Sequence, residues 1–314
     1  MKTIVGVDIG GTWLRAALFD LDFTMLARTE QPSCAEEGGN AVVDRLIEMI
    51  LQALPESPEE LLGVGIGAPG PLDPATGVII KTPNLPWENL PLVRLVQEAL
   101  GCTVYLGNDA DVAALAEHRL GAGKGARHMV YMTISTGIGG GVIMDGKLLT
   151  GRGQGGEIGH MTIIPDGPVC SCGKPGHLEA LASGTAIARI ARERLAAGEE
   201  STLRGIPASG ITAAAVGDAA KAGDPMAADI VQQAGHHIGI SIASLMHLLN
   251  PEIVVLGGGV TEIGDLLFDS IHEAVRRYAM HPRYWEGTPI VRSALGGEVG
   301  LLGAAALVMM RHSL

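Results

Sequence analysis

Residues 5–12 read V-G-V-D-I-G-G-T, a short hydrophobic run that carries one carboxylate and ends in a glycine turn. Residues 131–141, Y-M-T-I-S-T-G-I-G-G-G, repeat this order of strand, glycine turn and strand. β-Branched residues favour strands, and glycines let the chain reverse tightly between them. The correspondence predicts a duplicated architecture of two related halves, with a soft boundary near residues 120–127.

The pattern around these turns predicts a mixed α/β protein. Strands at 3–8, 13–20 and 24–30 follow one another closely, which is typical of an antiparallel meander. Hydrophobic runs then alternate with segments of helical periodicity, which indicates α/β layers. Helices are expected at 40–54, 90–100, 110–120, 183–197, 212–222, 225–249, 263–280 and 300–311. Further strands are expected at 61–67, 103–106, 129–135, 141–144, 253–256 and 289–291.

Length and composition limit the class of protein. The chain has 314 residues, enough for two domains or one large split domain. Hydrophobic residues make up 47% of it, which excludes a disordered chain, and aromatic residues only 3%, so its cores must be aliphatic. The net charge of −12 argues against a nucleic-acid partner, because a negative protein repels phosphate backbones.

Cysteine usage and the hydrophobic runs predict a cytoplasmic protein with no membrane partner. The four cysteines (34, 102, 170 and 172) form no evident disulfide framework, which fits a reducing compartment. The N-terminus lacks the apolar core and cleavage site of a signal peptide. The longest apolar run, residues 299–310, is too short to span a bilayer.

The segment 156–179 concentrates metal-ligand side chains. Its soft ligands, which together could close a tetrahedral shell around Zn²⁺, are His160, Cys170, Cys172 and His177. Interleaved glycines and prolines forbid a long helix, so a tight loop is expected. The flanking carboxylates, Glu157 and Glu179, suggest a site for a ligand rich in hydroxyl groups. On these residues alone, unligated side chains remain an equal alternative, whereas strain argues against a 170–172 disulfide.

Three glycine turns follow buried strands and could bind phosphates. Residues 8–12, 135–137 and 257–259 can present backbone N–H groups to an anion without interference from Cβ atoms. Asp8 could hold Mg²⁺ beside the phosphates. Each turn taken singly could also be a plain reversal. The sequence G-I-G-A-P-G at 65–70 is rejected as a dinucleotide fingerprint, because its prolines stand where a helix should begin.

Two loops carry candidate groups for a sugar. In L-G-N-D-A-D (106–111), a carboxylate follows a strand and opens a helix. Catalytic and binding groups of α/β proteins usually lie at such carboxyl ends of strands. Asp109 is the candidate base and Asn108 would orient the substrate; the alternative is an ordinary helix N-cap. In T-P-N-L-P-W (82–87), the amide of Asn84 suits a sugar diol, with a plain turn as the alternative.

Taken together, the motifs resemble one family. D-I-G-G-T, G-A-P-G-P, T-P-N-L-P-W, L-G-N-D-A-D, S-T-G-I-G-G-G, G-E-I-G-H, C-S-C-G-K-P-G-H-L-E and G-G-G-V occur in this order. The sequence resembles the ROK family of sugar kinases, above all its bacterial glucokinases. The resemblance implies an actin-like ATPase-domain (ribonuclease H-like) duplicated fold, with two α/β domains around a cleft. The implied domains are 1–118 with 299–314, and 119–298 with a zinc-binding loop at 157–179.

The resemblance also implies roles for individual residues. Asp109 matches the general base that takes the proton from the 6-hydroxyl of the sugar. The hexose ligands it implies are Asn84, Asn108, Asp109, Glu157, His160 and Glu179. The nucleotide contacts it implies are Gly10, Gly11, Thr12, Thr136, Gly137 and Gly258, to which the reasoning from the residues adds Asp8 and Gly257. The zinc ligands it implies are His160, Cys170 and Cys172, and His177 stands where the family usually has a third cysteine.

The function expected from the resemblance is ATP-dependent phosphorylation of the 6-hydroxyl of a hexose, most simply glucose. ATP, Mg²⁺ and a structural Zn²⁺ are the expected cofactors, and a homodimer or homotetramer is the expected assembly. Kinases for fructose, mannose, N-acetylmannosamine, N-acetylglucosamine or allose resemble the same pattern, and polyphosphate stays open as a donor. A sugar-responsive transcription regulator is the other alternative; such relatives carry a helix-turn-helix before the first strand, and here that strand begins by residue 3.

Overall fold

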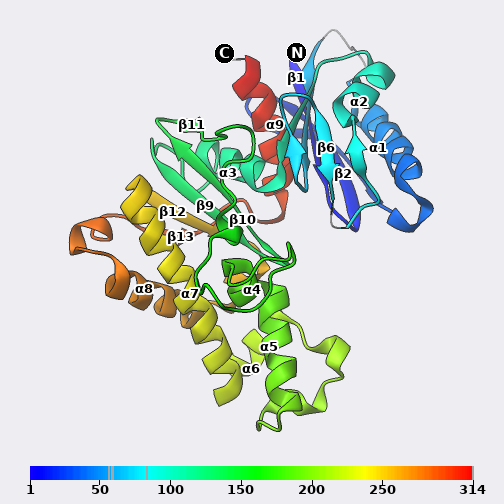
Figure 1. The fold of residues 1–314 in the computed structure, drawn as a ribbon. Coiled ribbons are helices and arrows are strands. Elements are labelled where there is room, and N and C mark those ends of the chain that lie inside the picture. Colours follow the sequence, from blue (N-terminus) through cyan, green and yellow to red (C-terminus); the bar gives the residue numbers. More distant parts are fainter. Residues whose placement is uncertain (56, 58–59, 83, 313–314) are drawn as a thin grey trace. The chain divides into compact units, whose positions relative to one another are not determined.

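The computed structural model describes residues 1–55, 57, 60–82 and 84–312 (Figure 1). The chain divides into two compact units. The first comprises Met1–Gly125, Leu148–Gly155 and Leu295–Leu314, and the second Ala126–Lys147 and Gly156–Ala294. The domain limits expected from sequence stay a prediction, and residues 313–314 of the expected 299–314 segment lie outside the described residues.

The first unit is built on a five-stranded sheet of order β3-β2-β1-β4-β8. Its strands are β1 (Thr3–Ile9), β2 (Trp13–Asp20), β3 (Met25–Pro32), β4 (Leu61–Ala68) and β8 (Val104–Asn108). β1, β2 and β3 pair antiparallel, so the expected meander is confirmed, whereas β4 and β8 add in parallel. The helices are α1 (Gly39–Ala53), α2 (Leu92–Leu100), α3 (Asp109–Arg119) and α9 (Val299–His312).

Helix α9 packs unusually close to the sheet of the first unit, and Figure 1 shows it in red beside β1. A Cβ atom added at Gly65 of β4 would lie 1.9 Å from the carbonyl oxygen of Ala304. One added at Gly6 of β1 would lie 2.2 Å from the carbonyl oxygen of Leu301. Glycine at these two strand positions therefore lets the helix backbone rest on the sheet backbone.

The second unit repeats the strand order in a second sheet, β11-β10-β9-β12-β13. Its strands are β9 (Met129–Ile134), β10 (Ile138–Met144), β11 (Lys147–Leu148), β12 (Ile253–Gly257) and β13 (Ile290–Arg292). β9 and β10 pair antiparallel, and β12 pairs parallel with β9 and β13. Both sheets place the first strand of their meander in the centre, so the predicted duplication is confirmed.

The helices of the second unit surround a largely aliphatic core. They are α4 (Leu178–Ala182), α5 (Gly184–Ala196), α6 (Ala213–Lys221), α7 (Pro225–Leu249) and α8 (Asp265–Tyr278). Asp224 caps α7: its Oδ1 accepts from the Ala227 N–H at 2.9 Å, and its Oδ2 accepts from the Ser201 hydroxyl at 2.8 Å. Among the described residues, no helix combines the length and the apolar character that crossing a membrane requires.

Several elements differ from the sequence prediction at their ends. The helix expected at 90–100 begins at Leu92, because 88–90 form β7 and pair with β6. The helix expected at 263–280 begins at Asp265, because Gly264, at φ 91°, separates it from a 3-10 helix. The helix α4, the strand β11 and a small sheet of β5 (Leu72–Asp73), β6 (Val78–Lys81) and β7 (Glu88–Leu90) were not predicted. In the described part of the chain, the 3-10 helices are Ala35–Glu37, Ile158–His160, Thr202–Gly205, Ala208–Gly210, Gly259–Ile263, Pro282–Tyr284 and Gly296–Glu298.

Candidate active site and metal centre

Asp8, near the end of β1, lies beside the first turn of α9. A Cβ atom added at Gly300 would lie 2.7 Å from Cγ of Asp8, so the carboxylate occupies the space that a side chain would need. Its Oδ2 lies 3.6 Å from Nη1 of Arg15. Burial raises the pKa of Asp8, Arg15 lowers it and Glu298 raises it, and the net effect is a pKa above the ordinary value. The side chain therefore stands at a helix N-terminus, where anions bind well.

The turn between β1 and β2 contains the predicted nucleotide contacts Gly10, Gly11 and Thr12. The N–H of Gly10 donates to the carbonyl of Trp13 at 2.9 Å, which closes the turn. A Cβ atom added at Gly11 would lie 2.7 Å from Cβ of Asn84. The predicted phosphate turn and the exposed Asn84, a predicted sugar ligand, are thus direct neighbours in the first unit. Pro83 of the same loop lies outside the described residues.

Asn108 and Asp109 stand at the N-terminus of α3. Oδ1 of Asn108 accepts from the Ala110 N–H at 2.9 Å, so Asn108 is the N-cap, as the alternative interpretation predicted. Its Nδ2 side faces Gly70, where an added Cβ would lie 3.1 Å away. Oδ1 of Asp109 also accepts from the Ala110 N–H, at 2.8 Å, and the Asp109 side chain is exposed. A carboxylate is therefore presented to solvent at the positive end of a helix.

In the second unit, Glu179 joins the second glycine turn to the cysteine loop. Its Oε2 accepts from the Ile138 N–H at 3.1 Å, and a Cβ added at Gly137 would lie 2.5 Å from that oxygen. Its Oε1 accepts from the Ser171 hydroxyl at 2.7 Å and lies 3.4 Å from Sγ of Cys170. Burial raises the pKa of Glu179, but the hydrogen bonds from Ser171, Ile138 and Cys170 outweigh it, and the pKa falls below its ordinary value.

The remaining predicted nucleotide contacts also lie in tight turns of the second unit. The carbonyl of Thr136 accepts from the hydroxyl of Thr185 at 2.8 Å, which ties the turn to the start of α5. Gly258 has a φ of 86°, and a Cβ there would lie 2.3 Å from the carbonyl oxygen of Ile134. A Cβ at Gly257 would lie 2.5 Å from Oη of Tyr131. The turn after β12 opens the short 3-10 helix Gly259–Ile263, and Gly264 separates it from α8.

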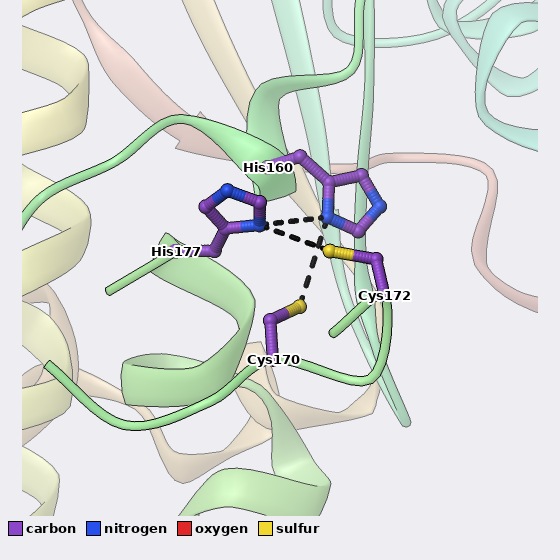
Figure 2. A group of neighbouring side chains, drawn as sticks. All are labelled: His160, Cys170, Cys172 and His177. Carbon is purple, nitrogen blue, oxygen red and sulfur yellow. Dashed lines mark hydrogen bonds between the residues drawn. The ribbon is translucent and has the colours of Figure 1, made fainter. Parts of the chain in front are cut away.

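Four side chains of the loop converge on one point, as Figure 2 shows. The ligand atoms of His160, Cys170, Cys172 and His177 all lie within 4.8 Å of one another. Nδ1 of His160 is 3.3 Å from Nδ1 of His177 and 3.7 Å from Sγ of Cys170, and Sγ of Cys172 is 3.3 Å from Nδ1 of His177. Zn²⁺ with bonds of about 2.0–2.3 Å holds tetrahedral ligand atoms roughly 3.3–3.8 Å apart. The donor set therefore fits a tetrahedral soft metal ion.

The two ring nitrogens of His160 face different partners. Its Nδ1 faces the other three ligands, whereas its Nε2 lies 3.9 Å from Oε2 of Glu157, whose side chain is exposed. One ring can thus serve a metal and a second ligand through different nitrogens. Burial raises the pKa of the Cys170 thiol. Because only the thiolate binds a metal, ion uptake would have to displace that proton.

The predicted residues fall into two groups, one in each unit. Those of the first unit are Asp8, Gly10, Gly11, Thr12, Asn84, Asn108 and Asp109, and those of the second are Thr136, Gly137, Glu157, His160, Glu179, Gly257 and Gly258, with the cysteine loop. Sequence reasoning missed Arg15 beside Asp8, Thr185 beside Thr136 and Ser171 beside Glu179. Only Ser171 carried a signal, since it lies between the two candidate cysteine ligands.

Comparison with known proteins identifies relatives over the whole chain. The sequence profile of the ROK family matches residues 4–311. A glucokinase of Thermotoga maritima is 39% identical over 312 residues, and the alignment covers 98% of each chain. A ROK hexokinase from Thermus thermophilus has a similar structure, with a TM-score of 0.84, 40% identity and 99% of each chain covered. A ROK glucokinase from Streptomyces griseus in complex with glucose and AMPPNP has a TM-score of 0.83 at 34% identity, with 98% of this chain and 99% of that chain covered.

Relatives of a second kind are longer. A xylose repressor of Caldicellulosiruptor bescii is 30% identical over 313 residues, which cover 98% of this chain but 78% of the repressor. The shared fold therefore occurs both in kinases and in regulators, and fold alone does not separate these functions.

Proposed function

This chain belongs to the ROK family, and we propose that it is a glucokinase that transfers the terminal phosphoryl group of ATP to the 6-hydroxyl of glucose. Two glucokinases are 38% and 39% identical to it over nearly its whole length. The observation that carries the proposal is the exposed Asp109 carboxylate at the N-terminus of α3, in a motif that the kinase chemistry requires.

Asp109 acts as the general base. Phosphoryl transfer depends mainly on positioning, so the base has to orient the 6-hydroxyl in line with the terminal phosphate and accept its proton. Asn108 uses Oδ1 to cap α3, which leaves its amide NH₂ group as the part suited to donate to a neighbouring sugar hydroxyl. Asn108 can therefore cap α3 and contact the sugar at the same time.

The other proposed sugar ligands are Asn84, Glu157, His160 and Glu179. Carboxylates accept hydrogen bonds from ring hydroxyls, and the Nε2 side of His160 lies next to Glu157. Glu179 already accepts from Ser171 and Ile138, so a sugar hydroxyl would share its oxygens with these partners. This arrangement holds its carboxylate in one orientation before a sugar binds.

The nucleotide is held by the glycine turns. Backbone N–H groups at Gly11 and Gly137 can approach phosphate oxygens closely, and the hydroxyls of Thr12 and Thr136 add donors. Gly10 contributes the tight turn itself, because its N–H donates to the carbonyl of Trp13. Gly257 and Gly258 complete the proposed set in the second unit. Asp8, beside the first turn of α9, is the residue that would hold Mg²⁺, which supplies neutralisation of phosphate charge when it is bound.

We propose that the cysteine loop binds a structural Zn²⁺ through His160, Cys170, Cys172 and His177. The separations of their ligand atoms support this assignment. A bound ion supplies a rigid link between loop segments that contain neither long helix nor strand. With two thiolates and two neutral imidazoles, the shell carries one negative charge fewer than a three-cysteine shell.

Three further expectations belong to this proposal. Residues 1–118 with 299–314, and residues 119–298, are proposed as the two domains. The assembly is proposed to be a homodimer or homotetramer. The compartment is proposed to be the cytoplasm, where ATP is available and the four free cysteines stay reduced.

A sugar panel tests the proposal directly. The purified protein is assayed by ADP release with glucose, fructose, mannose, N-acetylmannosamine, N-acetylglucosamine and allose, with ATP or polyphosphate as donor. Glucose with ATP should give the highest kcat/KM. A higher value for another sugar reassigns the substrate. Absence of turnover with every sugar, together with salt-sensitive binding to duplex DNA, favours the regulator function of the longer relatives.

A further inference from the structure

Glu117 is a fully buried carboxylate that the proposed chemistry does not use. It lies near the C-terminal end of α3, the helix that begins with Asp109. Both of its oxygens accept backbone hydrogen bonds: Oε2 from the Ala122 N–H at 2.8 Å and Oε1 from the Leu295 N–H at 3.0 Å. Buried charge is costly unless it is satisfied in this way, so these contacts fix the carboxylate and its partners together.

The two donors occupy particular places in the chain. The first unit gives way to the second after Gly125, and the chain returns to the first unit at Leu295. Ala122 and Leu295 are therefore the anchor points of the first and the last of the four passages between units. The backbone oxygen of Glu117 also accepts from the N–H groups of Gly121 and Gly123, at 3.1 and 3.0 Å. One residue thus holds both passages against the end of α3.

The segment after Leu295 leads straight to the proposed phosphate site. Leu295 precedes the 3-10 helix Gly296–Glu298, and α9 follows with Gly300 against the carboxylate of Asp8. Glu117 consequently connects the helix that carries Asp109 with the segment that borders Asp8. A shift of about 1 Å between reacting groups can cost roughly 10²-fold in rate, so such a connection bears on catalysis.

We propose that Glu117 is a positioning residue for phosphoryl transfer. By fixing the first and last passages at one carboxylate, it keeps Asp109 and Asp8 in register during turnover. This inference deepens the proposed function and rests on it for the reaction.

Gly121 offers an independent way to disturb the contact. A Cβ atom there would lie 2.1 Å from Oε2 of Glu117. Gly121→Ala therefore pushes the carboxylate off its partners while the charge is retained, whereas Glu117→Gln keeps the shape but turns an NH₂ group toward a backbone donor. The matched controls are Glu98→Gln, an exposed position on α2, and Gly205→Ala, where an added Cβ meets nothing within 4 Å.

The experiment measures kcat for glucose phosphorylation, the Kd for glucose by calorimetry without ATP, and hydrogen exchange of the whole chain. Glu117→Gln and Gly121→Ala are both expected to lower kcat by about 10- to 100-fold. The Kd for glucose should change by less than about threefold, because the backbone groups that Glu117 binds, at Ala122 and Leu295, are not proposed sugar ligands. Exchange should accelerate at 121–123 and 295–297, and the controls should behave as wild type.

Two results would overturn the inference. One is a kcat within about twofold of wild type for both variants, with unchanged exchange at both segments. The other is a general rise in exchange with kcat and glucose affinity lost together, which marks a purely structural role. If the wild-type protein phosphorylates no sugar, the proposed function is wrong, and the positioning role is wrong with it. Hydrogen exchange at the two segments then tests only whether the contacts of Glu117 exist.

Discussion

Oε2 of Glu179 accepts a hydrogen bond from the backbone N–H of Ile138 at 3.1 Å, and through it the first helix after the cysteine loop holds the second glycine turn. The other oxygen of the same carboxylate binds Ser171, between the two cysteines. The proposed sugar site, metal loop and nucleotide turn of the second unit therefore share one side chain. A substitution in any one of these three sites should therefore alter the binding properties of the other two.

Glu179→Gln should lower kcat/KM for both substrates, glucose and ATP. The amide loses the carboxylate charge and keeps one acceptor oxygen. If its NH₂ group faces the Ile138 N–H, a donor faces a donor, which costs about 1–3 kcal/mol; if it faces Ser171, the hydroxyl has to turn and accept instead of donating. Steady-state kinetics should show kcat/KM lower by about 10- to 100-fold for glucose and for ATP alike. Ser171→Ala, which removes one donor only, should have a smaller effect. A loss confined to glucose would mean that Glu179 does not support the nucleotide turn.

Asp109→Ala and Asp109→Asn should abolish most of the turnover. Loss of a general base typically lowers kcat by about 10² to 10⁴-fold, and the amide cannot accept the proton. Because the side chain is exposed, the fold should survive, which circular dichroism and thermal unfolding check. Asp111 is not a suitable control because it is buried, so Asp22→Asn on the surface serves instead. Activity within about tenfold of wild type would remove Asp109 from the role of base.

Metal analysis tests the cysteine loop. Plasma emission spectrometry should find about one zinc per chain, and chelation should lower the melting temperature, because metal binding and loop folding are coupled. His177→Ala should lose the metal, whereas His177→Cys should retain it and release it more slowly to a chelator. Cys102→Ser, outside the cluster, should not change the zinc content. Full zinc content in His177→Ala would place the metal elsewhere.

The cap of α7 should give the protein an acid-sensitive component of stability. Burial alone would raise the pKa of Asp224, but hydrogen bonds from Ala227, Thr202 and Ser201 lower it to about 2. Its stabilisation is therefore present above the pKa of the unfolded chain and is lost as the pH falls toward 2.

Chemical denaturation at a series of pH values measures this component. Asp224→Asn should be less stable than wild type by about 1–2 kcal/mol at pH 7, and the difference should shrink below about pH 4. Asp218→Asn, on the exposed face of α6, should show no such trend. A difference that is constant from pH 7 to pH 2 would show that the charge of Asp224 is not its source.

Gly65→Ala should destabilise the first unit strongly. The added methyl group would lie 1.9 Å from the carbonyl oxygen of Ala304, a backbone atom that cannot turn aside. Overpacking of a fixed core typically costs about 1–3 kcal/mol, and the melting temperature should fall by several degrees. Gly205→Ala is the control, since no atom lies within 4 Å of its added Cβ. An unchanged melting temperature would mean that α9 can move away from β4.

Strand alternation and helical periodicity predicted most of the fold, because buried faces impose these periods on the sequence. The 25-residue helix Pro225–Leu249 was predicted with its bounds, since a proline starts it and Asn250 ends it in a left-handed conformation. The small sheet of β5, β6 and β7 was not predicted, because its strands are too short to show alternation. α4 was missed for the same reason, since five residues barely exceed one helical turn.

The candidate site was predictable where one residue type suits one chemistry. The four metal-ligand side chains stood out because two of the four cysteines lie close in sequence to two histidines. The partners that hold them were not predictable, because serine and threonine are common and their roles arise from contacts between distant segments. The Ile138 contact of Glu179, which spans 41 residues, is such a case.

The packing of α9 sets an order of events during synthesis. Residues 299–312 leave the ribosome only after the whole of the second unit has been made, yet they cover β1 and β4, which emerge among the first. Until then α3 can cover this face near Gly67 and Gly107, but the part around Gly6 and Gly65 lacks the helix that buries it. During most of translation, the nascent chain therefore exposes hydrophobic surface of its N-terminal sheet. Chaperones that bind exposed aliphatic surface would be expected to bind it there.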